Sequence, residues 1–134
     1  MKYWENVASP VSSGVTVVAV DRRYRSLVGR VKRCTERALA RMGRADARIE
    51  LYLVGSSKMR SNVLAFEPPK NFPQHRGGGT FLGEVYLNPT YIQNQGEELD
   101  YMALHGILHL VGYDHRKAGD RIGMEQKERE LLHG

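Results

Sequence analysis

Three histidines near the end of the sequence have a type and spacing suited to holding a metal ion. His105 and His109 lie four residues apart in an apolar stretch, and His115 follows. Residues four apart on a helix project from nearly the same side, about 6 Å apart along the axis, so two imidazoles can reach one ion. Gly112 allows the chain to leave the helix and turn, which can return His115 as a third ligand. We expect one zinc ion per chain here.

Three nitrogen ligands leave the fourth tetrahedral position of zinc available, as in catalytic rather than structural sites. Histidines four apart on a helix are more often surface or packing residues. Here the third histidine, the glycine and apolar neighbours such as Leu104 and Leu108 favour a metal site, because buried imidazoles need partners. Asp114 could orient an imidazole or act as an acid–base group, and the alternative is a turn residue. Gly106 occupies the position of the glutamate base of HExxH peptidases, so that mechanism lacks its proton acceptor.

Strands and helices that could position these histidines are predicted from the spacing of apolar residues. Alternation and β-branched residues predict strands, and steps of three and four residues predict helices. The first strand reads as buried, and the second has one buried face. A brief helical turn could follow at 56–59. The expected strands are 15–20, 48–53, 63–66 and 80–87, and the expected helices are 22–42, 97–111 and about 118–132.

Two segments lack any sustained period. Residues 1–14 contain a proline and small polar residues, and we expect a loosely held lead-in. Residues 67–79 hold three prolines and three consecutive glycines, which exclude regular structure and predict a mobile loop. Such a long loop in a small domain is often functional, so it could close over bound RNA; the alternative is a plain flexible connector.

Composition and charge favour a soluble domain with a polyanionic partner. The 134 residues suit a single domain over 1–134, and neither a membrane-spanning run nor a signal peptide is visible, so we expect a cytoplasmic protein. The net charge is +5, and ten of the twenty Lys and Arg residues lie between Asp21 and Arg48. The first helix should therefore carry a cationic face that could grip nucleic-acid phosphates; the alternative is a solvated helix face. The single cysteine, Cys34, falls on the apolar face of that helix and is expected to be core.

The run HGILHLVGYDH at 105–115 closely resembles the HGxLHLxGYDH signature of the YbeY family of bacterial endoribonucleases. Further resemblance covers most of the chain from about Val15 onward. It lies in NVLAF at 62–66, like the family's T(D/N)VLSF strand, in LGEV at 82–85, like its LGDI strand, and in Met124 and Glu128 of the final helix.

This resemblance implies an α+β fold, with a small mixed sheet of about four strands flanked by helices and the metal site on a helix and the turn after it. It also implies a zinc-dependent single-strand endoribonuclease that matures ribosomal RNA, notably at the 3′ end of 16S rRNA, and takes part in ribosome quality control. The three histidines would bind the zinc, and a ribosomal protein could be a partner. Two alternatives stay open: a non-catalytic RNA-binding ribosome-assembly factor with a structural zinc, and another zinc hydrolase such as a metallopeptidase.

The sequence departs from the family pattern at two positions. Gly55 stands where a YRxxDxPT-like segment carries an arginine, and Arg60 is the nearest substitute. Its role would be to bind or polarise a phosphate, which a planar guanidinium suits, and the alternative is a solvated loop charge. Glu84 replaces the family's aspartate and lengthens the side chain. If the strand at 80–87 edges the sheet beside the metal, it would form one wall of a substrate groove.

Overall fold

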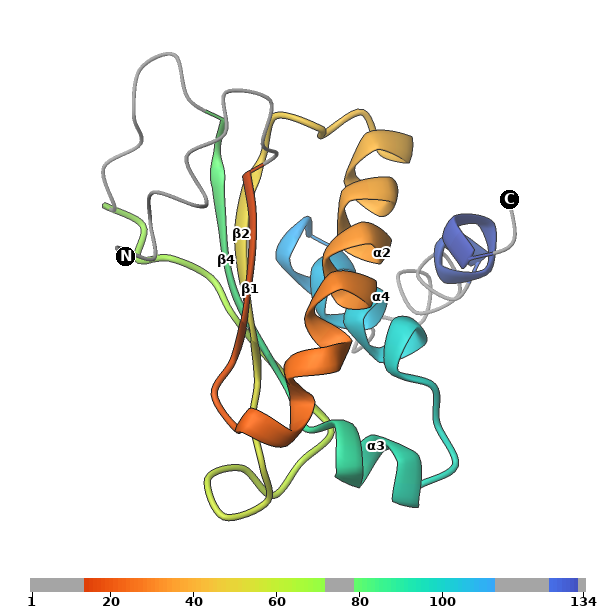
Figure 1. Ribbon diagram of the computed structural model, residues 1–134. Helices are drawn as coiled ribbons and strands as arrows, with labels where there is room; N and C mark the ends of the chain where they lie inside the picture. Colours follow the sequence, from red (N-terminus) through yellow and green to blue (C-terminus); the bar gives the residue numbers. More distant parts are fainter. Residues whose placement is uncertain (1–13, 72–78, 113–125, 133–134) are drawn as a thin grey trace.

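The structure is a computed structural model that describes residues 14–71, 79–112 and 126–132. A four-stranded sheet lies beside a layer of helices (Figure 1), so the predicted α+β class is confirmed. A last helical segment covers 126–132. The other elements, in chain order, are β1 (Gly14–Ala19), η1 (Arg22–Leu27), α2 (Val28–Arg41), β2 (Arg48–Leu53), β3 (Val63–Phe66), β4 (Phe81–Leu87), α3 (Pro89–Asn94) and α4 (Leu99–Leu110).

The sheet is mixed, as expected, and has the strand order β1-β2-β4-β3. The strands β1, β2 and β4 are parallel, and β3 runs antiparallel to β4 at one edge. Along β2, Ile49, Leu51 and Leu53 are fully buried, whereas the residues between them are half-buried. Side chains of a strand alternate between the two faces, so this pattern places the buried face of the sheet against the helices.

The helices α2 and α4 cover one face of the sheet in the described part of the chain (Figure 1). The helix α2 packs on β1, whereas α4 packs on β3 and β4. An ion pair of 3.0 Å between Arg30 and Asp100 joins the two helices. The side chain of Arg41 donates to the backbone oxygen of Leu131 at 2.9 Å, so the segment 126–132 is tied to α2. The layer between sheet and helices is filled by residues such as Val31, Leu39, Val85, Leu104, Ile107 and Leu108.

The opposite face of the sheet is more open than the sequence indicated. We expected 15–20 to be a buried strand, but only Val15 of β1 is buried. The strand lies at an edge, and no helix of the described residues packs on its second face. Three large apolar side chains are exposed there: Val20, Leu64 and Phe66.

The helix predicted at 22–42 is divided into two parts. The first part, η1, is a 3-10 helix, because Asp21 closes tight turns onto the next residues: its carboxylate accepts from the backbone N–H of Arg23 at 3.1 Å and its carbonyl from that of Tyr24 at 3.0 Å. The second part, α2, is the expected amphipathic helix, with Val31, Thr35, Ala38 and Leu39 on its buried side.

One helix was not predicted. The Asn-Pro dipeptide after β4 indicated only the end of a strand, but Asn88 caps α3 by accepting from the N–H of Tyr91 at 3.1 Å, and Pro89 occupies the first turn. Both residues are common signals for the start of a helix.

The remaining boundaries agree closely with the prediction, where the structure describes them. The helix expected at 97–111 is α4, Leu99–Leu110. The brief helical turn expected at 56–59 is also present: 56–58 form a turn, and the backbone N–H of Met59 donates to the oxygen of Gly55 at 3.2 Å. Gly14, assigned to the lead-in, begins β1; a Cβ atom there would lie 2.5 Å from the oxygen of Ala47. Residues 1–13, 72–78 and 118–125 lie outside the described residues. No helix of the described residues is long and apolar enough to cross a membrane.

Candidate metal centre

The helix α4 presents His105 and His109 to one pocket. Their rings lie 5.0 Å apart between centroids, at an interplanar angle of 71°. Both side chains are half-buried, and both line a pocket of about 370 Å³ between α4 and β3. Imidazole nitrogens are among the ligands that zinc prefers, and two of them approach one space from the same side of a helix. These two side chains therefore fit a metal site.

The glycine between the histidines lets the helix lie close to the sheet. A Cβ atom on Gly106 would lie 2.7 Å from Cγ1 of Val85 and 3.1 Å from Cγ2 of Val63. Position 106 is where an HExxH peptidase carries its glutamate. A longer side chain there would push α4 away from β3 and β4, so the packing of this helix has no room for that base.

The third proposed ligand is not part of the described structure. The helix ends as predicted, because Gly112 follows it with φ of 108°, a backbone angle that glycine adopts readily. Asp114 and His115 lie outside the described residues. Within the described ranges, no group of three His, Cys, Asp or Glu side chains could hold a metal ion. The role of His115 as a ligand, and of Asp114 beside it, therefore stays a prediction.

One side chain near the histidines was not predicted to have a role. Oε2 of Glu128 lies 3.4 Å from Nδ1 of His105, and the carboxylate is only 2% exposed. In the sequence, Glu128 appeared only as a point of family resemblance. A signal was available, because Glu128 precedes Leu131 and Leu132 by three and four residues and so lies on the apolar face of the last helix.

The wall of the pocket is β3, not the strand at 80–87. The strand at 80–87 would form this wall only at the edge of the sheet, and that condition is not met, because β4 lies between β2 and β3. At the start of β3, Asn62 donates to Oε1 of Glu97 at 2.9 Å and accepts from the N–H of Val63 at 2.8 Å. These hydrogen bonds tie the strand to the segment that leads into α4. The pocket is lined by Asn62, Val63, Leu64, Ala65, Met102, His105, Gly106 and His109.

Arg60, the proposed substitute for the family's arginine, is exposed and does not line the pocket. Gly55, where the family arginine was expected, lies against a different pair. A Cβ atom on it would be 2.7 Å from Oδ2 of Asp21, which forms an ion pair of 3.1 Å with Arg23. The backbone N–H of Arg23 and then its guanidinium lower the pKa of Asp21. Position 55 therefore adjoins the carboxylate of Asp21, and it is this carboxylate that pairs with an arginine.

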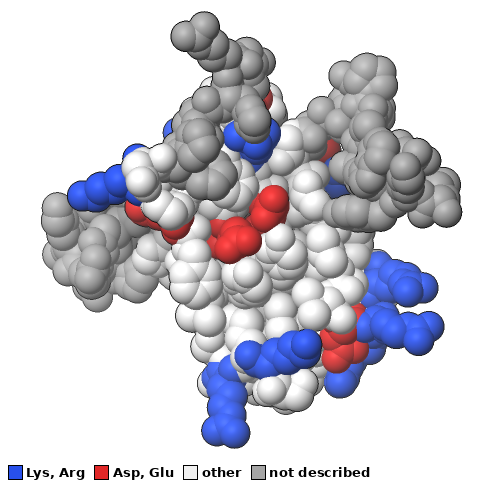
Figure 2. All heavy atoms as spheres, turned by 90° about the vertical axis from the view of Figure 1, so that its left-hand side faces the viewer, with Lys and Arg blue, Asp and Glu red and all other residues white. Residues whose placement is uncertain are grey.

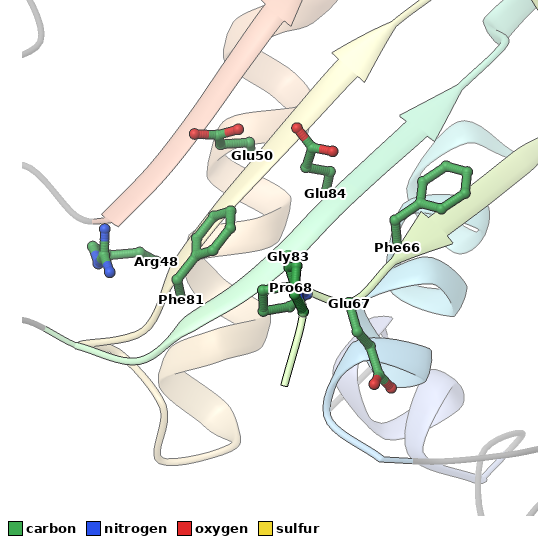
Figure 3. Close-up of a pocket in the computed structure, with 9 residues that line it drawn as sticks. Arg48, Glu50, Phe66, Glu67, Pro68, Phe81, Gly83 and Glu84 are labelled. Atoms are coloured by element: carbon green, nitrogen blue, oxygen red, sulfur yellow. The ribbon is translucent and has the colours of Figure 1, made fainter. Parts of the chain in front are cut away.

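Glu84 lies on the other face of the sheet from the histidines. Its neighbour Val85 points toward α4, and alternation turns Glu84 away. It pairs in register with Glu50, and the two carboxylates lie side by side in Figure 3. Tyr52 donates to Glu50 at 2.8 Å, and Tyr86 donates to Glu84 at 3.4 Å. Burial, and then the neighbouring glutamates, raise the pKa of both tyrosines.

This face carries hollows of its own. One, of about 370 Å³, is shown in Figure 3 and is lined by Arg48, Glu50, Phe66, Phe81 and Glu84 among others. Another, of about 550 Å³, extends over Val20, Leu64 and Tyr86. Acidic side chains occupy the middle of this face, and Lys and Arg lie toward its rim (Figure 2). The acidic centre makes the middle of this face a poor surface for phosphate groups.

Cys34 takes no part in the chemistry of the site. It lies half-buried on α2 and packs against the core, as expected. Burial, and then the charge of Asp100, raise the pKa of its thiol to about 11. The thiol is therefore protonated near neutral pH, which suits a residue packed against the core.

Comparison with known proteins identifies the family. Residues 50–134 match the family model described as Endoribonuclease YbeY. A protein of that name from Anaeromyxobacter sp. (strain Fw109-5) is 35% identical, over 81% of this chain and 65% of the relative. One from Anaeromyxobacter dehalogenans is 34% identical, over 69% and 56%. One from Geobacter metallireducens is 29% identical, over 87% and 93%.

The chain thus spans less than two thirds of the length of the two Anaeromyxobacter relatives, and nearly all of the Geobacter relative. The matched region includes β3, β4 and α4, and with them both described histidines and Glu128. The chain belongs to the endoribonuclease YbeY family.

Proposed function

We propose that this protein is a zinc-dependent endoribonuclease that cleaves single-stranded RNA, with His105, His109 and His115 as the zinc ligands. The observation that carries the proposal is the pair of imidazoles, 5.0 Å apart, that line one pocket on α4. Membership of the YbeY family supports RNA as the substrate. It also supports the finer assignment to ribosomal RNA maturation in the cytoplasm, at the 3′ end of 16S rRNA, with a ribosomal protein as a possible partner class.

A zinc ion held by the three histidines would act as a Lewis acid toward a phosphoryl oxygen and would make water a better nucleophile near neutral pH. The chain's own residues bind and orient the substrate. The edge strand β3 forms one wall of the pocket. The amide of Asn62 bonds Glu97 and Val63, and among the described residues its second N–H and second oxygen lone pair stay available to a substrate. Arg60, which is exposed just before β3, would attract a phosphate group of the bound RNA. Asp114 would orient the imidazole of His115, the next residue in the chain.

The test combines zinc stoichiometry with RNA cleavage for the intact chain and for His109→Ala. We expect one zinc per intact chain, and loss of both zinc and cleavage in the variant. Gln93→Ala, an exposed polar residue of α3 outside the pocket, is the control and should change neither. If His109→Ala keeps its zinc and its cleavage rate, the site assignment is wrong.

The same samples separate the competing functions. An RNA-binding assembly factor with a structural zinc would bind RNA and zinc without cleaving. A metallopeptidase would cleave peptides instead, but the close packing at Gly106 argues against it. Cleavage of single-stranded RNA by the zinc-loaded chain, with no cleavage of peptides, is the result that we expect.

A further inference from the structure

The segment 126–132 brings a buried carboxyl group against one of the proposed zinc ligands. Oε2 of Glu128 lies 3.4 Å from Nδ1 of His105, a little beyond an optimal hydrogen bond. Among the described residues this oxygen has no hydrogen-bond partner, although it is fully buried. The pair is therefore a close contact that a small rotation of either side chain would convert into a hydrogen bond.

Burying such a group is costly unless it is paired. A carboxylate removed from water loses its hydration, and a nearby donor must compensate for that loss. The polar group that the structure places against Glu128 is the ring of His105, whose side chain is 25% exposed. The residue itself is firmly held, because Leu131, one turn later, is buried and accepts from Arg41 of α2.

The two ring nitrogens of a histidine have different tasks when one of them binds a metal. A hydrogen bond from one N–H to a carboxylate fixes the tautomer, so that the other nitrogen keeps its lone pair. It also restrains the ring. In this chain Nδ1 of His105 faces the carboxylate, and the residue lines the pocket that it shares with His109.

We propose that Glu128 is a positioning residue for the metal site: it accepts a hydrogen bond from Nδ1 of His105 and holds the ring with Nε2 as the coordinating nitrogen. This inference rests on the proposed zinc site. It makes the last helix part of the site, although that helix contributes no zinc ligand of its own. A residue at position 128 can hold the His105 ring in this way only if its side chain ends in a hydrogen-bond acceptor and is as long as that of glutamate.

The experiment measures zinc affinity by competition with a chromogenic chelator, without any RNA. Glu128→Met keeps the length of the side chain and suits a buried position, but it removes the acceptor. We expect zinc to bind about 10- to 100-fold more weakly. Glu128→Gln retains a neutral acceptor and should give an intermediate affinity. The matched control is Glu130→Met on the same helix, where the carboxylate is 68% exposed, and its zinc affinity should equal that of the parent chain.

Two further readouts separate positioning from a merely structural role. In the zinc-free protein, Glu128→Met should unfold at the same or a higher temperature, because a buried carboxyl group is replaced by an apolar one. Nitrogen-15 NMR of the His105 ring should show the proton on Nδ1 in the parent chain, and a shift of the proton toward Nε2 in Glu128→Met.

The outcomes also distinguish this inference from the proposed function. If Glu128→Met binds zinc as tightly as the parent chain, or if the ring tautomer does not change, the inference is wrong while the zinc site stands. If the parent chain binds no zinc, the proposed function fails first.

Discussion

At the scale of single residues, Gly106 decides how close α4 lies to the sheet, and hence where the two histidines are held. Replacement by alanine adds a methyl group 2.7 Å from Val85 and 3.1 Å from Val63, so the helix or the valines must move. We expect Gly106→Ala to lower the free energy of unfolding by about 1–3 kcal/mol, as overpacking does. Denaturation with urea measures this change, and zinc affinity should fall with it.

A second helical glycine provides the control. Gly29 lies in α2, where an added Cβ atom would meet only the flexible end of Arg33, at 3.1 Å. Alanine favours a helix over glycine by about 1 kcal/mol, so Gly29→Ala should leave stability unchanged or raise it. Equal effects of the two substitutions would show that close packing at position 106 does not determine the stability of α4.

Residue by residue, the sequence predicted the metal site only in part. The i, i+4 spacing was enough to bring His105 and His109 to one pocket, because helix geometry is local. The contact of Glu128 with His105 depends on how the last helix packs, which no local pattern determines. Glu84 resembled a family residue, but its direction follows from the register of β4 and could not be read from the motif.

At the scale of elements, Asn88 connects the loop before β3 with the start of α3. It is fully buried, and its amide nitrogen donates to the oxygen of Met59 at 3.0 Å and to Ser56 at 3.1 Å. Its side-chain oxygen caps α3 by accepting from Tyr91. Asn88→Ala takes the donor away from the buried oxygen of Met59 and removes the cap of α3, so we expect a loss of about 2–4 kcal/mol in the free energy of unfolding.

Thermal unfolding in the absence of zinc checks this prediction. The control is Asn94→Ala at the exposed end of the same helix, which should change the unfolding temperature little. A similar small change in both variants would mean that water replaces the hydrogen bonds of Asn88, and that the loop before β3 is held in another way.

Elements with a regular pattern were predicted well, and those set by a few side chains were not. The strand β2 and the helix α4 were found within two residues, because burial on one face imposes a period. The 3-10 helix η1 and the short α3 depend on Asp21 and Asn88, whose side chains bond the backbone. Such capping is weaker than an apolar period as a signal, and Asn-Pro also ends strands.

At the scale of the whole molecule, the two faces of the sheet differ in covering and in charge. Helices cover one face, and the other presents Glu50 and Glu84 among tyrosines and exposed apolar side chains (Figures 1 and 2). The helix α2, with five Lys and Arg residues, lies on the helical side of the sheet (Figure 1). This division favours approach of RNA from the side of α2 and α4.

The salt dependence of RNA binding tests this orientation. Each bound phosphate releases counterions, so removing one cation that binds single-stranded RNA should reduce the slope of log affinity against log salt by about 0.7 in magnitude.

Arg33 is exposed on α2, and Lys58 is exposed beside the hollow on the opposite face. We expect Arg33→Gln to reduce both the affinity for a single-stranded RNA oligonucleotide and the slope, and Lys58→Gln to change neither. Fluorescence anisotropy at several salt concentrations measures both. The reverse pattern would place RNA on the face of the sheet that carries Glu50 and Glu84, away from the histidine pocket.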